Sequence, residues 1–274
     1  MNKKASIGVI GCGWLGLPLA EALVASGCRV KGSTTSIPRL EILKNKDIDP
    51  YLVRFPDADL NALGDLLDCD VLIINIPPRG RTAEGAASYQ SMADLITGKA
   101  VERRVKKIIL VSSTSVYQDT NTTVTESSPA EPDSPTARLL LEVENQFLAL
   151  IDKQVCVLRP AGLVGPDRHP GGFFKNKSSI PNGLAPVHLI HRDDVIGLLL
   201  SLISNPEVKG IYNACSLTHP AKHEFYAKAA KVLGNPVPGF LLEEKSYKIV
   251  SSDRIKAELH YSFKYPDLMS WLNG

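Results

Sequence analysis

The residues with the clearest chemical meaning are three glycines near the start of the chain. Gly11, Gly13 and Gly16 form the pattern G-x-G-x-x-G, with Trp14 and Leu15 between the last two, after an expected strand and before an expected helix. In such a unit the first glycine permits a tight turn, the second lets the backbone approach a pyrophosphate, and the third lets helix and strand pack closely. The helix N-terminus adds N–H groups and a positive dipole end. The segment predicts a dinucleotide site; the alternative is a glycine-rich turn that binds nothing.

The choice of dinucleotide depends on the end of the second expected strand. An Asp or Glu about 20 residues beyond the glycines binds the ribose 2′-hydroxyl in NAD sites, but residues 29–36 read RVKGSTTS and contain no acid. Ser33, Thr34 and Ser36 are suited to donate to a 2′-phosphate, and Arg39 offers the guanidinium fork that phosphate prefers. We therefore predict NADP(H) over NAD(H). The alternative for Arg39 is an ordinary exposed helix residue.

The elements that must position this loop alternate along the chain. Short apolar runs are separated by helical patterns, which predicts parallel strands joined by right-handed crossovers. The runs lack polar alternation, as expected when helices cover both faces of a sheet. The expected strands are Ile7–Ile10, Arg29–Gly32, Tyr51–Arg54, Val71–Ile76, Lys107–Ser112 and Gln154–Arg159, and the expected helices are Gly16–Ser26, Pro38–Lys46, Leu60–Leu67, Ala86–Val101 and Pro135–Leu150.

The sequence changes character beyond residue 160. Residues 161–186 are rich in glycine, proline and polar side chains, which is typical of a long loop over a functional site. The fold class predicted is α/β, a Rossmann-like doubly wound parallel sheet with a small C-terminal substrate lobe. We assign residues 1–160 and 187–214 to the Rossmann core, and residues 161–186 and 215–274 to the lobe. Later expected elements are strands at Val187–Ile190 and Ile211–Ala214, and helices at Asp194–Ile203, Pro220–Leu233 and Ser252–Glu258.

Composition and charge exclude several classes of protein. The 274 residues are 44% apolar and 22% charged, and a formal net charge of +2 is too small to indicate a nucleic-acid partner. No stretch outside the glycine segment is long enough to span a membrane. The five cysteines lack metal-ligand and C-x-x-C spacing, which favours a reducing compartment. We therefore expect a cytoplasmic protein that binds neither nucleic acid nor membrane.

Six motifs along nearly the whole chain carry a family resemblance. They are GCGWLG (11–16), IPP (76–78), VSSTSVY (111–117), LRPAGLVGPDRHPGGFF (158–174), HLIHRDDVIG (188–197) and YNACS (212–216). With them the chain resembles the extended and atypical short-chain dehydrogenases/reductases of the NAD-dependent epimerase/dehydratase type, and among these the bacterial YeeZ-like proteins. The resemblance implies a small polar substrate such as a nucleotide-sugar, and it admits a homodimer. It puts the loop of Ile76 and Pro77 beside the adenosine and pyrophosphate, with Arg79 or Arg81 as phosphate contacts or as solvent-facing side chains.

The same resemblance identifies a departure at the catalytic positions. In that superfamily a Ser or Thr four residues before a V-Y tyrosine polarises the substrate oxygen, and Ser113 stands in this position relative to Tyr117. A Tyr-x-x-x-Lys pair on the next long helix exchanges the proton, because the lysine lowers the tyrosine pKa. Here the two positions hold Thr136 and Leu140. Hydride transfer by the usual machinery is therefore in question.

Other side chains near these motifs are candidates for the missing roles. Tyr117 is either a replacement phenol or a packed aromatic with its hydroxyl on the backbone. His169 is a candidate for proton transfer and Arg168 for an anionic substrate, the alternative being a structural loop with exposed charges. Ser115, at a strand end, and His191, in the segment that lines the substrate cleft of the superfamily, are candidates for substrate contact.

We expect no metal site. His188 and His191 lie close to Asp193 and Asp194, but two histidines across a strand end need not point the same way, and no cysteine lies nearby. The aspartates are better explained as capping the helix that starts there. Two functions stay open: an NADP-dependent oxidoreductase or epimerase with unusual acid/base groups, and a dinucleotide-binding sensor or partner-binding protein without catalysis.

Overall fold

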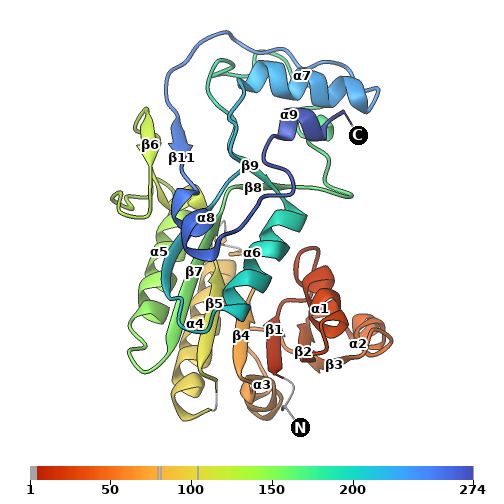
Figure 1. Cartoon of the computed structure of the whole chain (residues 1–274), viewed down its shortest axis with the longest axis vertical. Helices are drawn as coiled ribbons and strands as arrows, with labels where there is room; N and C mark the ends of the chain where they lie inside the picture. Colours follow the sequence, from red (N-terminus) through yellow and green to blue (C-terminus); the bar gives the residue numbers. More distant parts are fainter. Residues whose placement is uncertain (1–4, 79, 81, 104, 274) are drawn as a thin grey trace. The chain divides into compact units, whose positions relative to one another are not determined.

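The computed structural model describes residues 5–78, 80, 82–103 and 105–273. The chain forms two compact units (Figure 1). Unit 1 comprises Met1–Val116, Pro132–Leu158 and Leu199–Ile211, and unit 2 comprises Tyr117–Glu131, Arg159–Leu198 and Tyr212–Gly274. Within the described ranges, no helix has the length and apolar character needed to cross a membrane.

A seven-stranded sheet organises unit 1, in the order β3-β2-β1-β4-β5-β7-β10. Strand β1 pairs in parallel with β2 on one side and with the central strand β4 on the other. The direction of winding therefore reverses between β1 and β4, which is the switch point where open α/β sheets bind ligands. The strands are β1 Ser6–Ile10, β2 Arg29–Thr34, β3 Ile48–Leu52, β4 Val71–Ile74, β5 Lys107–Val111, β7 Gln154–Pro160 and β10 Gly210–Ala214.

Burial and capping explain these elements locally. Every residue of β1 and of β5 is buried, as expected for strands covered by helices on both faces. Several helices begin at a capping side chain. The Asp59 carboxylate accepts hydrogen bonds from backbone N–H groups in the first turn of α3, and the Thr82 and Ser134 hydroxyls accept one each in α4 and α5. The helices of this part are α1 Gly16–Ala25, α2 Ile37–Lys44, α3 Leu60–Leu67, α4 Ala83–Glu102 and α5 Pro135–Leu148. The Rossmann-like doubly wound fold predicted from the sequence is confirmed.

Unit 2 contains two small parallel pairs of strands. Strand β6 (Thr122–Val124) pairs with β11 (Lys248–Val250), and β8 (Gly162–Val164) pairs with β9 (Leu189–His191). The prediction that a strand at 187–190 belongs to the Rossmann core was wrong, because β9 pairs with β8 outside the seven-stranded sheet. Residues 161–186, expected as one long loop, contain β8 and the short 3₁₀ helix η2 (Pro170–Gly172).

Helices and a small core complete unit 2. Helix α6 (Arg192–Ser204) begins here, and α7 (Lys222–Val232), α8 (Asp253–Leu259) and α9 (Leu268–Trp271) follow. Buried apolar side chains from β8, β9, α7 and α9 form one cluster: Val164, Val187, Leu189, Phe225, Tyr226, Ala229, Leu268 and Leu272.

Asp194 links the first turn of α6 to the C-terminal segment. Its fully buried carboxylate accepts hydrogen bonds from the backbone N–H groups of Lys264 (2.6 Å) and Tyr265 (2.9 Å) and from the Tyr261 hydroxyl (3.1 Å). Helix capping therefore does not describe the role of this aspartate. Its carboxylate satisfies donors from a segment about 70 residues further along the chain.

We expect Asp194→Asn to lower the free energy of unfolding by about 2 kcal/mol or more, because the amide group sets a donor against buried N–H groups. Asp193→Asn is the matched control. Asp193 is partly exposed; its carboxylate ion-pairs with Lys264 and Arg192 and lies 3.9 Å from the His191 Nδ1, so we expect a loss below about 1 kcal/mol. Urea unfolding of both variants measures the difference. Equal stability of the two variants would show that the buried carboxylate contributes no more than the exposed one.

Candidate dinucleotide-binding site

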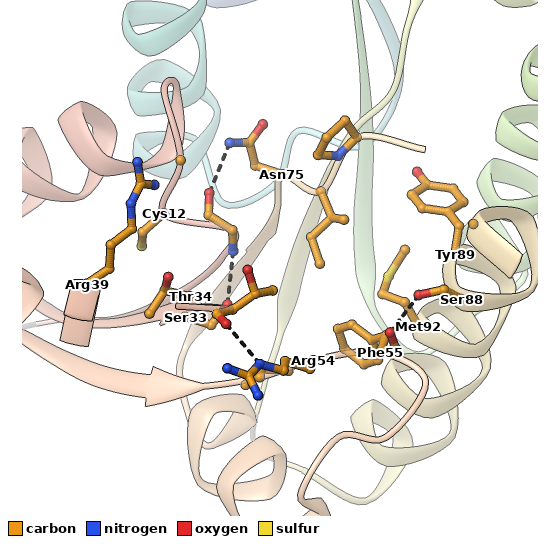
Figure 2. A pocket seen from close by; sticks show the side chains of 17 residues that line it. Cys12, Ser33, Thr34, Arg39, Arg54, Phe55, Asn75, Ser88, Tyr89 and Met92 are labelled. Carbon is orange, nitrogen blue, oxygen red and sulfur yellow. Dashed lines mark hydrogen bonds between the residues drawn. The ribbon is translucent and has the colours of Figure 1, made fainter. Parts of the chain in front are cut away.

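The glycine loop is fastened between the ends of three strands. The Gly11 N–H donates to the Ser33 hydroxyl (3.0 Å), and the Asn75 amide donates to the Gly11 carbonyl (3.2 Å), as Figure 2 shows. The N–H of Cys12 donates to the Ser33 carbonyl at 2.9 Å. Gly11 has φ +99°, and a Cβ there would lie 2.5 Å from the Asn75 carbonyl oxygen. Only glycine fits this position.

The other two glycines differ in what surrounds them. A Cβ at Gly16 would lie 2.1 Å from the Gly11 carbonyl oxygen, so this glycine closes the turn. A Cβ at Gly13 would meet nothing within 4 Å. Helix α1 begins at Gly16 with no side chain capping it. The loop therefore combines an open cradle with an uncapped helix N-terminus, which fits the pyrophosphate of a dinucleotide.

A pocket of about 430 Å³ extends from this loop. Its walls come from the glycine loop, from the ends of β2, β3 and β4, and from the first turns of α4 (Figure 2). The lining residues are Gly11, Cys12, Gly13, Ser33, Thr34, Thr35, Arg39, Val53, Arg54, Phe55, Asn75, Ile76, Pro77, Gly85, Ser88, Tyr89 and Met92.

The charge of the pocket is positive at the end of β2. Arg39 and Arg54 line it, and no Asp or Glu does so among the residues that the structure describes. The Arg54 Nε donates to the Thr35 carbonyl at 2.9 Å, which fixes the plane of its guanidinium. The hydroxyl of Thr34 accepts from the Ser36 N–H at 3.2 Å and shapes the turn into α2. This wall offers guanidinium groups and hydroxyls, the donors that bind phosphate.

Two further side chains of the pocket have informative environments. The Tyr89 side chain is 3% exposed, and its buried hydroxyl has no hydrogen-bond partner within the described chain. An orphaned donor in the wall of a pocket fits a site that a polar ligand completes. Burial raises the pKa of the Cys12 thiol to about 12, so this cysteine in the loop is not a reactive thiolate.

The predicted cofactor residues divide between the pocket wall and its support. Gly11, Gly13, Ser33, Thr34, Arg39, Ile76 and Pro77 line the pocket, whereas Trp14, Leu15 and Gly16 do not. Leu15 is 4% exposed and belongs to the core. Arg79 and Arg81 lie outside the described residues.

The sequence missed one wall of the pocket, which includes Arg54, Phe55, Ser88, Tyr89 and Met92. Arg54 and Phe55 follow β3, and the carboxyl ends of parallel strands lie at the same edge of a sheet. That rule was sufficient to find them. The residues of α4 carry no such signal, because their place depends on how the helix packs.

The candidate catalytic serine lies at the carboxyl end of β5. Ser113 is partly exposed, and its hydroxyl accepts from the N–H of the exposed Ser115 at 3.1 Å. On α5, Leu140 is only 3% exposed, and a Cβ at Gly80 would lie 3.0 Å from the Thr136 hydroxyl oxygen. Of the two positions expected from the resemblance to hold Tyr and Lys, the Leu140 position is therefore buried, and the Thr136 position is half-buried beside Gly80.

Tyr117 belongs to a buried polar cluster in unit 2. Arg159 donates to its hydroxyl (2.7 Å), and the hydroxyl donates to the Asn213 side-chain oxygen (3.0 Å). The expectation that a packed Tyr117 places its hydroxyl on the backbone was wrong, because the hydroxyl bonds two side chains instead. Burial raises the pKa of Tyr117, although the Arg159 charge opposes the shift. This phenol stays protonated near neutral pH.

His169 and His191 flank the same tryptophan in unit 2. The ring centroids lie 5.5 Å (His169) and 5.0 Å (His191) from that of Trp271, and His191 also lies 4.0 Å from Tyr265. Desolvation by burial lowers the pKa of both imidazoles, so both are neutral near pH 7. Arg168 is exposed. Within the described part of the chain, no group of three or more His, Cys, Asp or Glu side chains is arranged to hold a metal ion.

The chain is similar to known proteins over nearly its whole length. No family model matches the chain. Protein YeeZ of Escherichia coli K12 is 40% identical over 266 residues, which are 95% of this chain and 96% of that protein. The structure of human epimerase family protein SDR39U1 with NADPH has a TM-score of 0.77, 18% identity and 97% coverage of both chains. That of UDP-glucose 4-epimerase from Thermotoga maritima with UDP-glucose has a TM-score of 0.78, 17% identity and 97% coverage of both.

The fold and the glycine loop define a Rossmann-like protein with a doubly wound parallel sheet. Within that class the chain belongs to the YeeZ family, since the 40% identity extends over nearly the full length of both proteins.

The glycines allow folding and binding to be separated. We expect Gly13→Ala to change the free energy of unfolding by less than about 1 kcal/mol, because its methyl group enters open space. The same methyl occupies the phosphate cradle, so NADPH binding weakens by about tenfold or more. Gly16→Ala, whose methyl meets backbone, lowers the free energy of unfolding by about 2 kcal/mol or more. Urea unfolding measures the stability of both variants, and calorimetric titration measures their affinity for NADPH. Unchanged NADPH affinity in Gly13→Ala would place the phosphates elsewhere.

Proposed function

We propose that this protein is an NADP(H)-dependent oxidoreductase or epimerase-like enzyme that acts on a small polar substrate. The observation that carries the proposal is the charge of the pocket: Arg39 and Arg54 line it, and no carboxylate does so within the described residues. NAD sites use an acid at this point to bind the ribose 2′-hydroxyl, and a 2′-phosphate would be repelled there. The similar human structure, which contains NADPH, supports the proposal.

The two arginines suit a 2′-phosphate for different reasons. Arg54 is oriented by its hydrogen bond to Thr35, so little side-chain entropy is lost on binding. Arg39 lies in the first turn of α2, where the positive end of the helix dipole adds to its charge. Both side chains are exposed, so each contributes about 1–2 kcal/mol to the preference for NADPH over NADH.

A dinucleotide held by the glycine loop and the pocket would bring hydride chemistry to the site, and the chain's own side chains would position the substrate. We assign Ser113 as the donor to a substrate oxygen, with Ser115 as a further contact. In unit 2, His169 is the candidate for proton transfer; its Nδ1 accepts from the Gly171 N–H (3.1 Å), so the neutral ring carries its proton on Nε2 and can donate it. Arg168 is exposed and suits an anionic part of the substrate, whereas His191 is 2% exposed and its Nδ1 accepts from the Asp193 N–H, so we infer a packing role for it. A nucleotide-sugar has such an anionic part, and the similar Thermotoga maritima epimerase is described with UDP-glucose.

We infer a structural role for Tyr117. Its hydroxyl is occupied on both sides by Arg159 and Asn213, and its raised pKa makes it a poor proton donor and a poor base near neutral pH. The cytoplasmic location and the homodimer stay predictions.

One observation favours the second function, a dinucleotide-binding sensor or partner-binding protein. Leu140 is buried where the superfamily has lysine, so a lysine there would place a charge in the core at a cost of several kcal/mol. Thr136 packs against Gly80, which leaves little room for a tyrosine. We therefore expect that introducing tyrosine at position 136 and lysine at position 140 destabilises the fold.

Removing the arginines tests the cofactor assignment. We expect Arg54→Ala and Arg39→Ala each to weaken NADPH binding by about tenfold and to leave NADH binding within about twofold, because only NADPH carries the 2′-phosphate. Arg138→Ala is a control on α5, since that arginine does not line the pocket. Calorimetric titration of each variant with NADPH and with NADH gives the change in affinity for each cofactor relative to wild type. Parallel losses for both cofactors would contradict the assignment.

Turnover separates the enzyme from the sensor. We expect slow NADPH oxidation with a carbonyl substrate of the nucleotide-sugar class, and a fall of about 10²-fold in kcat for Ser113→Ala at unchanged NADPH affinity. Thr120→Ala is the matched hydroxyl control, because Thr120 is exposed and its hydroxyl bonds that of Thr122. Tight NADPH binding without turnover across such substrates would favour the sensor.

A further inference from the structure

One polar group of the pocket is left without a partner by the fold. The Tyr89 hydroxyl is buried in the wall formed by α4, and no hydrogen bond reaches it from the described chain. Its neighbour differs: the Ser88 hydroxyl donates to the Phe55 carbonyl at 2.7 Å. Figure 2 shows the Tyr89 side chain reaching into the pocket across from Cys12 and Arg39.

Such an orphaned hydroxyl is costly. A buried hydroxyl without a partner destabilises a protein by about 1–3 kcal/mol, and phenylalanine would fill the same volume without this cost. A polar group that enters the pocket would compensate for the missing hydrogen bond.

We propose that Tyr89 is a cofactor-binding residue whose hydroxyl donates a hydrogen bond to the adenosine half of the bound dinucleotide. The inference rests on the proposed function. Its location favours that half, because the pocket wall continues from Tyr89 to the ends of β2 and β3, where Arg39 and Arg54 meet the expected 2′-phosphate. Adenine nitrogens and ribose and phosphate oxygens are all acceptors.

The electrostatic surroundings make Tyr89 a donor. Burial raises the pKa of its phenol, and the negative charge of Glu144 raises it further. Glu144 is itself fully buried and accepts from the Ser112 hydroxyl. The phenol therefore stays protonated across the physiological pH range, so the group can donate a hydrogen bond.

The test compares Tyr89→Phe with wild type in two measurements. Calorimetry is expected to give about tenfold weaker NADPH binding, the effect of one lost hydrogen bond in a buried site. Thermal unfolding of the free protein is expected at the same or a higher temperature, because the orphaned hydroxyl is gone. Tyr226→Phe is the matched control: this tyrosine is buried in the core of unit 2 and does not line the pocket, so NADPH binding stays unchanged.

Cofactor fragments locate the contact. Adenosine 2′,5′-bisphosphate is expected to lose affinity for Tyr89→Phe by the same factor as NADPH, while reduced nicotinamide mononucleotide loses none. Unchanged NADPH affinity in Tyr89→Phe, or a loss confined to the nicotinamide fragment, overturns the inference and leaves the proposed function intact. A lower unfolding temperature of the free variant assigns Tyr89 a structural role and also overturns it. Failure of the wild-type protein to bind NADPH contradicts the proposed function itself.

Discussion

The close approach of backbone to backbone at the ends of β1 and β4 is the constraint on which the site depends. Gly11 lies where any side chain would overlap the Asn75 carbonyl, and Gly16 lies where one would overlap Gly11 itself. These contacts keep the turn tight, so that α1 begins at Gly16, shortly after β1 ends at Ile10. They also leave the space beside Gly13 open. The same packing that stabilises the switch point thus creates the cradle for phosphate.

The pocket and the expected catalytic positions on α5 differ in polarity and charge. The pocket near the end of β2 is polar and basic: the Ser33 hydroxyl bonds the glycine loop, and two arginines line the wall. On α5, by contrast, the positions expected from the resemblance to hold a proton relay are a buried leucine and a threonine beside Gly80. The residues of unit 1 thus offer a physical basis for binding a dinucleotide, whereas α5 offers none for the expected proton transfer.

The sheet of unit 1 was predictable because its signals are local. Apolar runs and helix-capping residues located most of its strands and helices within a few residues, and the glycine spacing located the site. The pair β6–β11 was not predictable: each strand has three residues, and about 125 residues separate partners such as Thr122 and Lys248. Strand β9 was found but assigned to the wrong sheet, since apolar character does not encode a partner. Tyr89 was missed because only the packing of α4 brings it to the pocket.

The central claim is that the pocket recognises the 2′-phosphate of NADP(H). Calorimetric titration of the wild-type protein with NADPH and NADH, side by side at two ionic strengths, tests it most directly. The account predicts about 10- to 100-fold tighter binding of NADPH, with the preference shrinking at high salt because the arginines are exposed. Equal affinities, or a preference for NADH, would contradict it and would reduce Arg39 and Arg54 to surface charges.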